Sequence, residues 1–255
     1  MDIAEKNNAA SRARNILQKA LAHPDSSSTL SVWSEVLFEG STKPTGTFEV
    51  LRLVESLHRE IQLAERQLSS LGVPESIYRG HFLSAYSAVD VKNVNATWNN
   101  FKHYITKELL LCLSFSAFII EENEPEFDQA QIVELEMLIS ELEEAIQSKS
   151  LDSSLSHFVE QQITLLRRGL NDYRVRGAKA LSKCYVDGLG DIIENAETIK
   201  KHSASPVVEQ VKTIWGHMQK ATEHAATLNK SVETVYKVFE NGNKLIESLS
   251  NIVSA

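Results

Sequence analysis

The sequence predicts an all-α fold, in the form of an elongated bundle of long antiparallel helices. Its 255 residues include 10 glycines and 5 prolines. Because these two residue types disfavour helix interiors, their scarcity leaves room for long helices. Apolar residues also recur at intervals of three and four along most of the chain, the spacing of an amphipathic helix. The length is sufficient for a substantial buried core, and we expect two parts, residues 1–123 and 124–255.

The N-terminal part, residues 1–123, is predicted to be a helical subdomain. His23-Pro24 ends the first helix, because a residue before proline avoids the helical conformation. Gly72 stands where a C-terminal glycine cap belongs. One segment, 29–38, also fits the alternation of a strand, but its helical neighbours favour a helix. The expected helices are 2–22, 29–38, 48–71, 75–88 and 95–122.

The most apolar stretch of the chain runs from Leu109 to Ile120 without a charge. As a helix it would span roughly 18 Å, whereas a membrane-spanning helix needs about 20 residues to cross a hydrocarbon core of about 30 Å. A permanent membrane anchor is therefore not expected. A helix that is apolar all round is normally buried, so we expect residues 109–120 to be fully covered. The alternative is a concealed segment that enters a membrane when it is uncovered.

The C-terminal part, residues 124–255, is predicted to hold longer helices. Glu124-Pro125 breaks the chain, and Asp128 can cap the helix that follows. Helices are expected at 128–148, at 152–201 and from Ser205-Pro206 onwards. Glycines at 177, 188 and 190 are expected to kink the second of these or to let another helix come close.

The last of these helices carries an apolar seam at alternating steps of four and three between residues 207 and 253. A repeat over more than six heptads favours coiled-coil-like packing, either within the chain or between chains. We predict that this seam binds a protein partner or a second copy. The predicted partner-binding residues are Val211, Ile214, Met218, Ala221, Ala225, Leu228, Val232, Val235 and Phe239.

Charge is unevenly distributed along the chain. The net charge of −8 argues against a general nucleic-acid binder, which needs a basic surface. Residues 121–144 hold ten acids and no base, whereas 167–183 hold six bases and one acid. We expect these consecutive segments to face each other, and the alternative is a charged surface for a phosphate-bearing ligand or an acidic partner. The predicted residues of this charged surface are Arg167, Arg168, Arg174 and Arg176.

The sequence predicts no metal site and no cofactor. His217 and His224 share a helix face, but seven residues separate them by about 10 Å, too far to share one zinc ion. No nucleotide-binding or hydrolase motif is present. Cys112 and Cys184 make no disulfide framework, so a reducing compartment is expected. Because the N-terminus shows no secretory signal, we expect a cytoplasmic protein.

Two short stretches resemble known families. Arg52-Leu-Val-Glu-Ser-Leu-His58 resembles the R-x4-6-H element of HEPN ribonucleases, although Leu53 stands where that family usually has a polar residue. The resemblance implies an arginine that polarises phosphate and a histidine that moves protons. Residues 138–200 resemble a helical segment of uncharacterised bacterial proteins, some from mobile or defence-associated loci. That likeness, which implies a bacterial role in conflict, rests on Leu155, Leu166, Arg167-Arg168, Tyr173, Val175 and Gly177.

Three functions follow as expectations. The first is a non-enzymatic partner-binding or assembly component that acts through the heptad seam, with no permanent membrane span. The second is a membrane-active effector, since long helices around one concealed apolar segment resemble the α-helical pore-forming toxins at the level of the fold. The third is a ribonuclease that uses Arg52 and His58.

Overall fold

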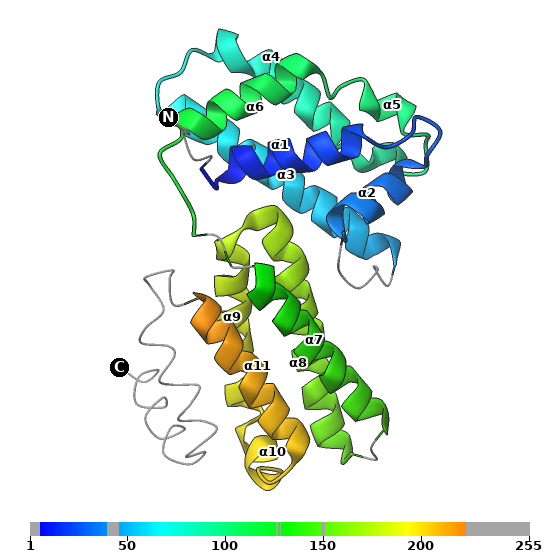
Figure 1. Ribbon diagram of the computed structural model, residues 1–255, viewed down its shortest axis with the longest axis vertical. Helices are drawn as coiled ribbons and strands as arrows, with labels where there is room; N and C mark the ends of the chain where they lie inside the picture. The colour runs from blue at the N-terminus through cyan, green and yellow to red at the C-terminus, as the bar shows by residue number, and fades with distance from the viewer. Residues whose placement is uncertain (1–5, 40–45, 126, 128, 149–150, 223–255) are drawn as a thin grey trace. The chain divides into compact units, whose positions relative to one another are not determined.

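The protein is all-α in the computed structural model, which describes residues 6–39, 46–125, 127, 129–148 and 151–222 (Figure 1). Within these ranges there are helices and no strand, apart from an isolated antiparallel bridge between Ser28 and Thr97. The larger part of the predicted heptad seam, residues 223–253, lies outside the described residues.

The described residues group into two compact units. The first comprises the described parts of Met1–Glu126 together with Asn171–Gly177, and the second those of Phe127–Leu170 and Ala178–Ala255. The first unit therefore receives seven residues from much later in the chain. The predicted division into domains after residue 123 stays a prediction, because a compact unit need not fold independently.

The first unit is built around α3. This helix contacts α1, α2 and α4, while α6 lies against α1 and α4. Trp33 and Trp98 meet edge to face in the core, with 5.4 Å between their ring centroids, and the Trp98 indole donates to the carbonyl of Ala20. The elements are α1 (Ala9–Leu21), α2 (Thr29–Leu37), α3 (Thr47–Ser70), α4 (Glu75–Ala88), the 3-10 helix η1 (Val91–Asn93), α5 (Asn99–Lys102) and α6 (Lys107–Ile119).

The predicted single helix at 95–122 is wrong, because the helical conformation is interrupted between the end of α5 at Lys102 and the start of α6 at Lys107. The Thr106 side chain accepts a hydrogen bond from the Leu109 amide and so caps the start of α6. Threonine favours this capping position over a helix interior, where its hydroxyl competes with the backbone hydrogen bonds. Residues 29–38, which also fitted a strand, form the helix α2 as predicted.

The second unit contains α7 (Gln129–Ser148), most of α8 (Ser153–Arg176), α9 (Ala178–Glu194), α10 (Ala196–Lys201) and α11 (Pro206–Thr222), with α11 packed on α7 and α9. The predicted helix 152–201 is interrupted at Gly177, which has a φ of 67°, and again before Ala196. Gly188 is a site of close packing, because a β-carbon there would collide with the Trp215 ring, while Gly190 faces open space.

Candidate functional site

One face of α6 leaves large apolar side chains in water. Leu111 is 72% exposed, Phe115 49% and Phe118 55%. Their spacing of four and then three residues places them on one side of the helix. The opposite side, which includes Leu109 and Leu113, is buried where α6 packs against α1 and α4. We call Leu111, Phe115 and Phe118 the exposed face of α6.

The expectation that residues 109–120 are fully covered is therefore wrong on this face. The two neighbouring helices, α1 and α4, cover only one side of α6. An apolar composition on the other side does not by itself place a third helix against it. The sequence of α6 does distinguish its exposed side from its buried side. The bulky Leu111, Phe115 and Phe118 follow one stripe, whereas the small Ser116 and Ala117 lie on the buried side, where neighbouring helices come close.

Polar contacts hold α6 in place at its C-terminus. Lys6 Nζ donates to the carbonyls of Phe118 and Ile120, each at 2.9 Å, and Asn8 Nδ2 donates to that of Ala117 at 2.9 Å. These donors satisfy carbonyls that the end of a helix leaves without partners. Among the described helices, none combines the length and the apolar content needed to cross a membrane.

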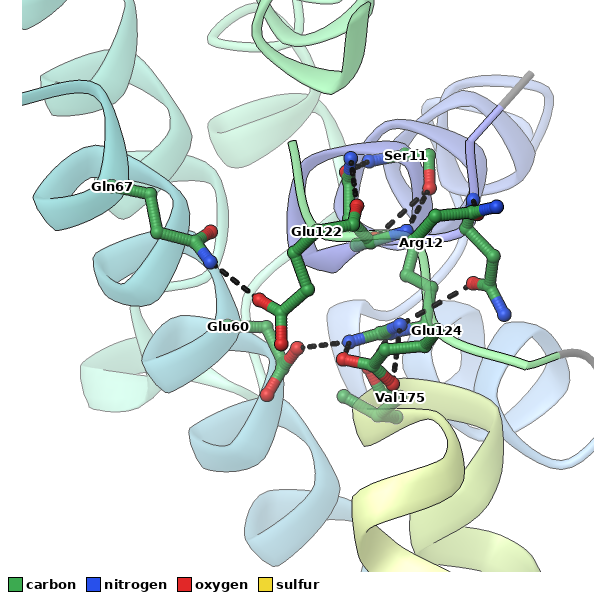
Figure 2. Close-up of polar contacts among 10 residues, drawn as sticks. Ser11, Arg12, Glu60, Gln67, Glu122, Glu124 and Val175 are labelled. Atoms are coloured by element: carbon green, nitrogen blue, oxygen red, sulfur yellow. Dashed lines mark hydrogen bonds and ion pairs between the residues drawn. The ribbon is translucent and has the colours of Figure 1, made fainter. Parts of the chain in front are cut away.

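A second feature of the first unit is a buried arginine (Figure 2). Arg12 lies on α1, and the residue is 8% exposed. Its guanidinium forms ion pairs with Glu60 at 2.7 Å and with Glu124 at 3.1 Å, and both glutamates are 7% exposed. It also donates from Nε to the Val175 carbonyl at 3.2 Å and from Nη1 to Asn7 Oδ1 at 3.3 Å.

These contacts engage every nitrogen of the guanidinium, whose five N–H groups form a fixed fork. Nη2 donates to Glu60 Oε2 and to Glu124 Oε1. Nη1 donates to Asn7 Oδ1 and lies at ion-pair distance from Glu124 Oε2. Arg12 therefore has a structural role, and we call its contacts with Asn7, Glu60, Glu124 and the Val175 carbonyl the Arg12 clasp. A sequence signal was present, since Arg12 falls among Ala9, Ala13 and Ile16 on the apolar side of α1.

The clasp is one of several contacts that hold Asn171–Gly177 in the first unit. Asn171 Nδ2 donates to Glu49 Oε1 at 3.1 Å, and Asp172 forms an ion pair with Arg52. The Val175 side chain is part of the apolar core. At Gly177, which has a left-handed backbone, an added β-carbon would collide with Arg12 and Glu124.

Arg52 and His58, the residues of the ribonuclease hypothesis, both lie on α3 with separate partners. Arg52 is held by Asp172. The His58 ring lies 3.1 Å from Gln62 Nε2 and packs on Tyr86 with 4.9 Å between centroids. Burial, together with a hydrogen bond to Glu65, raises the pKa of the Tyr86 hydroxyl, so this phenol stays protonated at neutral pH.

The described part of the predicted seam lies inside the second unit. Val211, Ile214 and Met218 are 0%, 1% and 0% exposed, and their helix α11 packs against α7 and α9. These three side chains are occupied within the chain and are not available to a partner in this conformation. The Ala221 side chain lies outside the described part of the structure, as do Ala225, Leu228, Val232, Val235 and Phe239.

The four arginines of the predicted charged surface differ in their contacts and in their exposure. Arg167 donates to both carboxylate oxygens of Glu143, at 3.1 and 2.8 Å, which confirms at this position that the basic segment faces the acidic one. Arg174 instead donates to the Glu39 carbonyl in the first unit. Arg168 is exposed and Arg176 is half-buried. The four arginines therefore do not form one cluster with a shared role.

The described residues contain no group of three or more His, Cys, Asp or Glu side chains placed to hold a metal ion. A cavity of about 270 Å³ in the second unit is lined by Leu138, Pro206 and Ile214 among others. That volume falls below the roughly 300–1,000 Å³ of typical small-molecule sites. Comparisons of the chain with protein-family models, with curated proteins and with solved structures gave no match.

Proposed function

We propose that this protein is a non-enzymatic component of a protein assembly and that the exposed face of α6 is a contact surface. The observation that carries the proposal is the set of Leu111, Phe115 and Phe118, exposed together on a helix fixed by its other side. Each Å² of apolar surface removed from water contributes about 25 cal/mol. Contiguous apolar patches on a protein surface are typical of interaction sites.

The proposal has three further parts, which concern the packing of the helices, the C-terminal seam and the cellular setting. We propose that the helices of the chain pack as a bundle and that residues 207–253 form a coiled-coil-like helix whose later part binds a partner or a second copy. The heptad spacing from Leu228 to Phe239 supports this role. The resemblance of residues 138–200 to uncharacterised bacterial proteins, some from mobile or defence-associated loci, supports a bacterial setting, and the lack of a secretory signal in the sequence supports the cytoplasm.

The test is fluorescence-detected sedimentation of the labelled protein, both in buffer and in extract of cells that express it. We expect a Phe115-dependent species heavier than the monomer in at least one medium, and Phe115→Asp should abolish it. Phe48→Asp is the matched control, because Phe48 is 89% exposed at the start of α3. A wild type that sediments like Phe115→Asp in both media would refute the proposal.

A membrane-active effector is the second candidate, favoured by the exposure of Phe115 and Phe118 on a helix without charges between residues 109 and 119. Such side chains can enter the interfacial region of a bilayer without spanning it. Dye release from neutral and anionic vesicles tests this candidate. Release that Phe115→Asp abolishes would support it, whereas intact vesicles at all protein concentrations and between pH 5 and 8 would remove it.

A further inference from the structure

We infer that the partner of the exposed face of α6 is the same face of a second copy, packed antiparallel about a twofold axis near Phe115. The inference rests on the proposed function and names its partner. Along the helix the exposed face reads Leu111, Phe115, Phe118, with Lys107 one turn before it and Glu121 just after the helix ends. Steps of four, four and three keep these helical positions on one side.

This arrangement is self-complementary only when the two helices run in opposite directions. In an antiparallel pair centred near Phe115, Leu111 packs against the partner's Phe118, and Phe115 meets the partner's Phe115. The twofold axis makes each contact occur twice, as in any isologous interface. Aromatic side chains are also the type enriched at the buried centres of protein interfaces.

The charges at the two ends of α6 favour the same direction. Lys107 and Glu121 are both exposed, and neither side chain forms a hydrogen bond or an ion pair with another described side chain. An antiparallel pair places each Lys107 near the partner's Glu121. A parallel pair would instead place lysine beside lysine and glutamate beside glutamate, which is unfavourable.

Glu108, the other charge at the start of α6, is engaged locally. Its carboxylate is hydrogen-bonded at the helix N-terminus by its own backbone amide and by the Thr106 side chain, contacts that lower the pKa of Glu108. Negative charge is favourable at that end of a helix. Lys107, whose charge also lowers the pKa of Glu108, is the exposed basic residue at this end of α6.

A protein surface suits this face better than a lipid surface. The chain has a net charge of −8, and the exposed Glu121 follows the last residue of α6 by two positions. Anionic lipid attracts basic segments and repels acidic ones. The area of a single helix pair is small compared with stable protein interfaces, so we expect reversible dimerisation with a Kd on the order of 10 µM.

Sedimentation equilibrium of the full chain between about 1 and 200 µM tests the inference. We expect a monomer–dimer equilibrium that Phe115→Asp weakens by about 100-fold and Phe48→Asp leaves unchanged. Lys107→Glu and Glu121→Lys should each weaken it several-fold, and the double variant should restore the wild-type value. Circular dichroism should show a helical spectrum for each variant, because the substituted positions are exposed.

Cross-linking provides a second readout of the same geometry. In a Cys112→Ser background, Phe115→Cys should oxidise to a disulfide-linked dimer, because residue 115 meets its own copy at the axis. Phe48→Cys is the control and should remain monomeric.

Three outcomes would overturn the inference. The wild type could be monomeric throughout, the dimer could persist in Phe115→Asp, or the charge-swapped double variant could fail to recover. A monomer in buffer that forms a Phe115-dependent complex in cell extract would refute the second copy but retain the proposed function. Phe115-dependent binding of the monomer to neutral or anionic vesicles would identify a membrane as the occupant.

Discussion

Replacing Arg12 by methionine should destabilise the first unit severely. Arg12 is the cation that Glu60 and Glu124 share, and all three residues are less than 9% exposed. Methionine preserves much of the side-chain volume but leaves both buried carboxylates without their counter-charge. Removing one partner of a buried ion pair costs about 3–5 kcal/mol. For a unit of this size that loss corresponds to a fall in Tm of roughly 10–15 °C.

Tryptophan fluorescence can follow the first unit alone. The chain has three tryptophans, of which Trp33 and Trp98 lie in the core of the first unit and Trp215 lies in the second. In a Trp215→Phe background, urea unfolding monitored by fluorescence therefore reports on the surroundings of Trp33 and Trp98. The difference in free energy of unfolding between Arg12→Met and its parent measures the contribution of the clasp.

Two further variants test whether the loss of stability comes from unpaired buried charge. Arg59→Met removes an arginine whose side chain is 72% exposed and pairs with Glu55 one turn away, so it should change stability by less than about 1 kcal/mol. Adding Glu60→Gln and Glu124→Gln to Arg12→Met removes the uncompensated charge and should recover a large part of the loss. A cost for Arg12→Met no greater than that for Arg59→Met, or no recovery in the triple variant, would refute the clasp.

Two other predictions concern the second unit, and a third concerns the Cys112 thiol of the first unit. Gly188→Ala should cost about 1–3 kcal/mol in urea unfolding because its β-carbon collides with Trp215, whereas Gly190→Ala, which meets nothing within 4 Å, should be neutral or stabilising by up to about 1 kcal/mol. Hydrogen bonds from Ser154 lower the pKa of Asp152 from 3.8 to about 2, so its ionised form stabilises the fold above pH 4. The stability difference between wild type and Asp152→Asn should shrink as the pH falls below 4 and level off only below pH 2. Burial raises the pKa of the Cys112 thiol, so its reaction with a disulfide reagent at pH 8 should be slower than that of a free cysteine, with a rate still rising above pH 9.

The sequence was informative wherever a local rule determines the backbone. Few glycines and prolines predicted an all-α chain, and Pro206 marks the start of α11 as expected. Gly177 was expected only to kink a continuous helix, whereas the helix ends there. Local rules also suggested that Gly188 permits close packing, although Trp215 could not be named because it lies on another helix.

The sequence was less informative where exposure depends on the number of neighbouring helices. The uncharged run from Leu109 to Ile120 predicted burial on every side, but apolar composition alone cannot show that α6 has neighbours on one side only. The Arg12 clasp was missed for a similar reason. Its partners Glu60, Glu124 and Val175 are 48 to 163 residues away in the chain, and no spacing rule connects them.

The membership of Asn171–Gly177 in the first unit has a consequence for synthesis on the ribosome. Chains usually begin to fold from the N-terminus as they emerge, at about 5–20 residues per second. The first unit cannot bury Val175 or supply every partner of Arg12 before residue 177 has been made. Until then Glu49 and Arg52 also lack the side chains of Asn171 and Asp172. The N-terminal part of this protein therefore completes its fold only after about two thirds of the chain has been made, and a fragment that ends at residue 126 should remain incompletely packed.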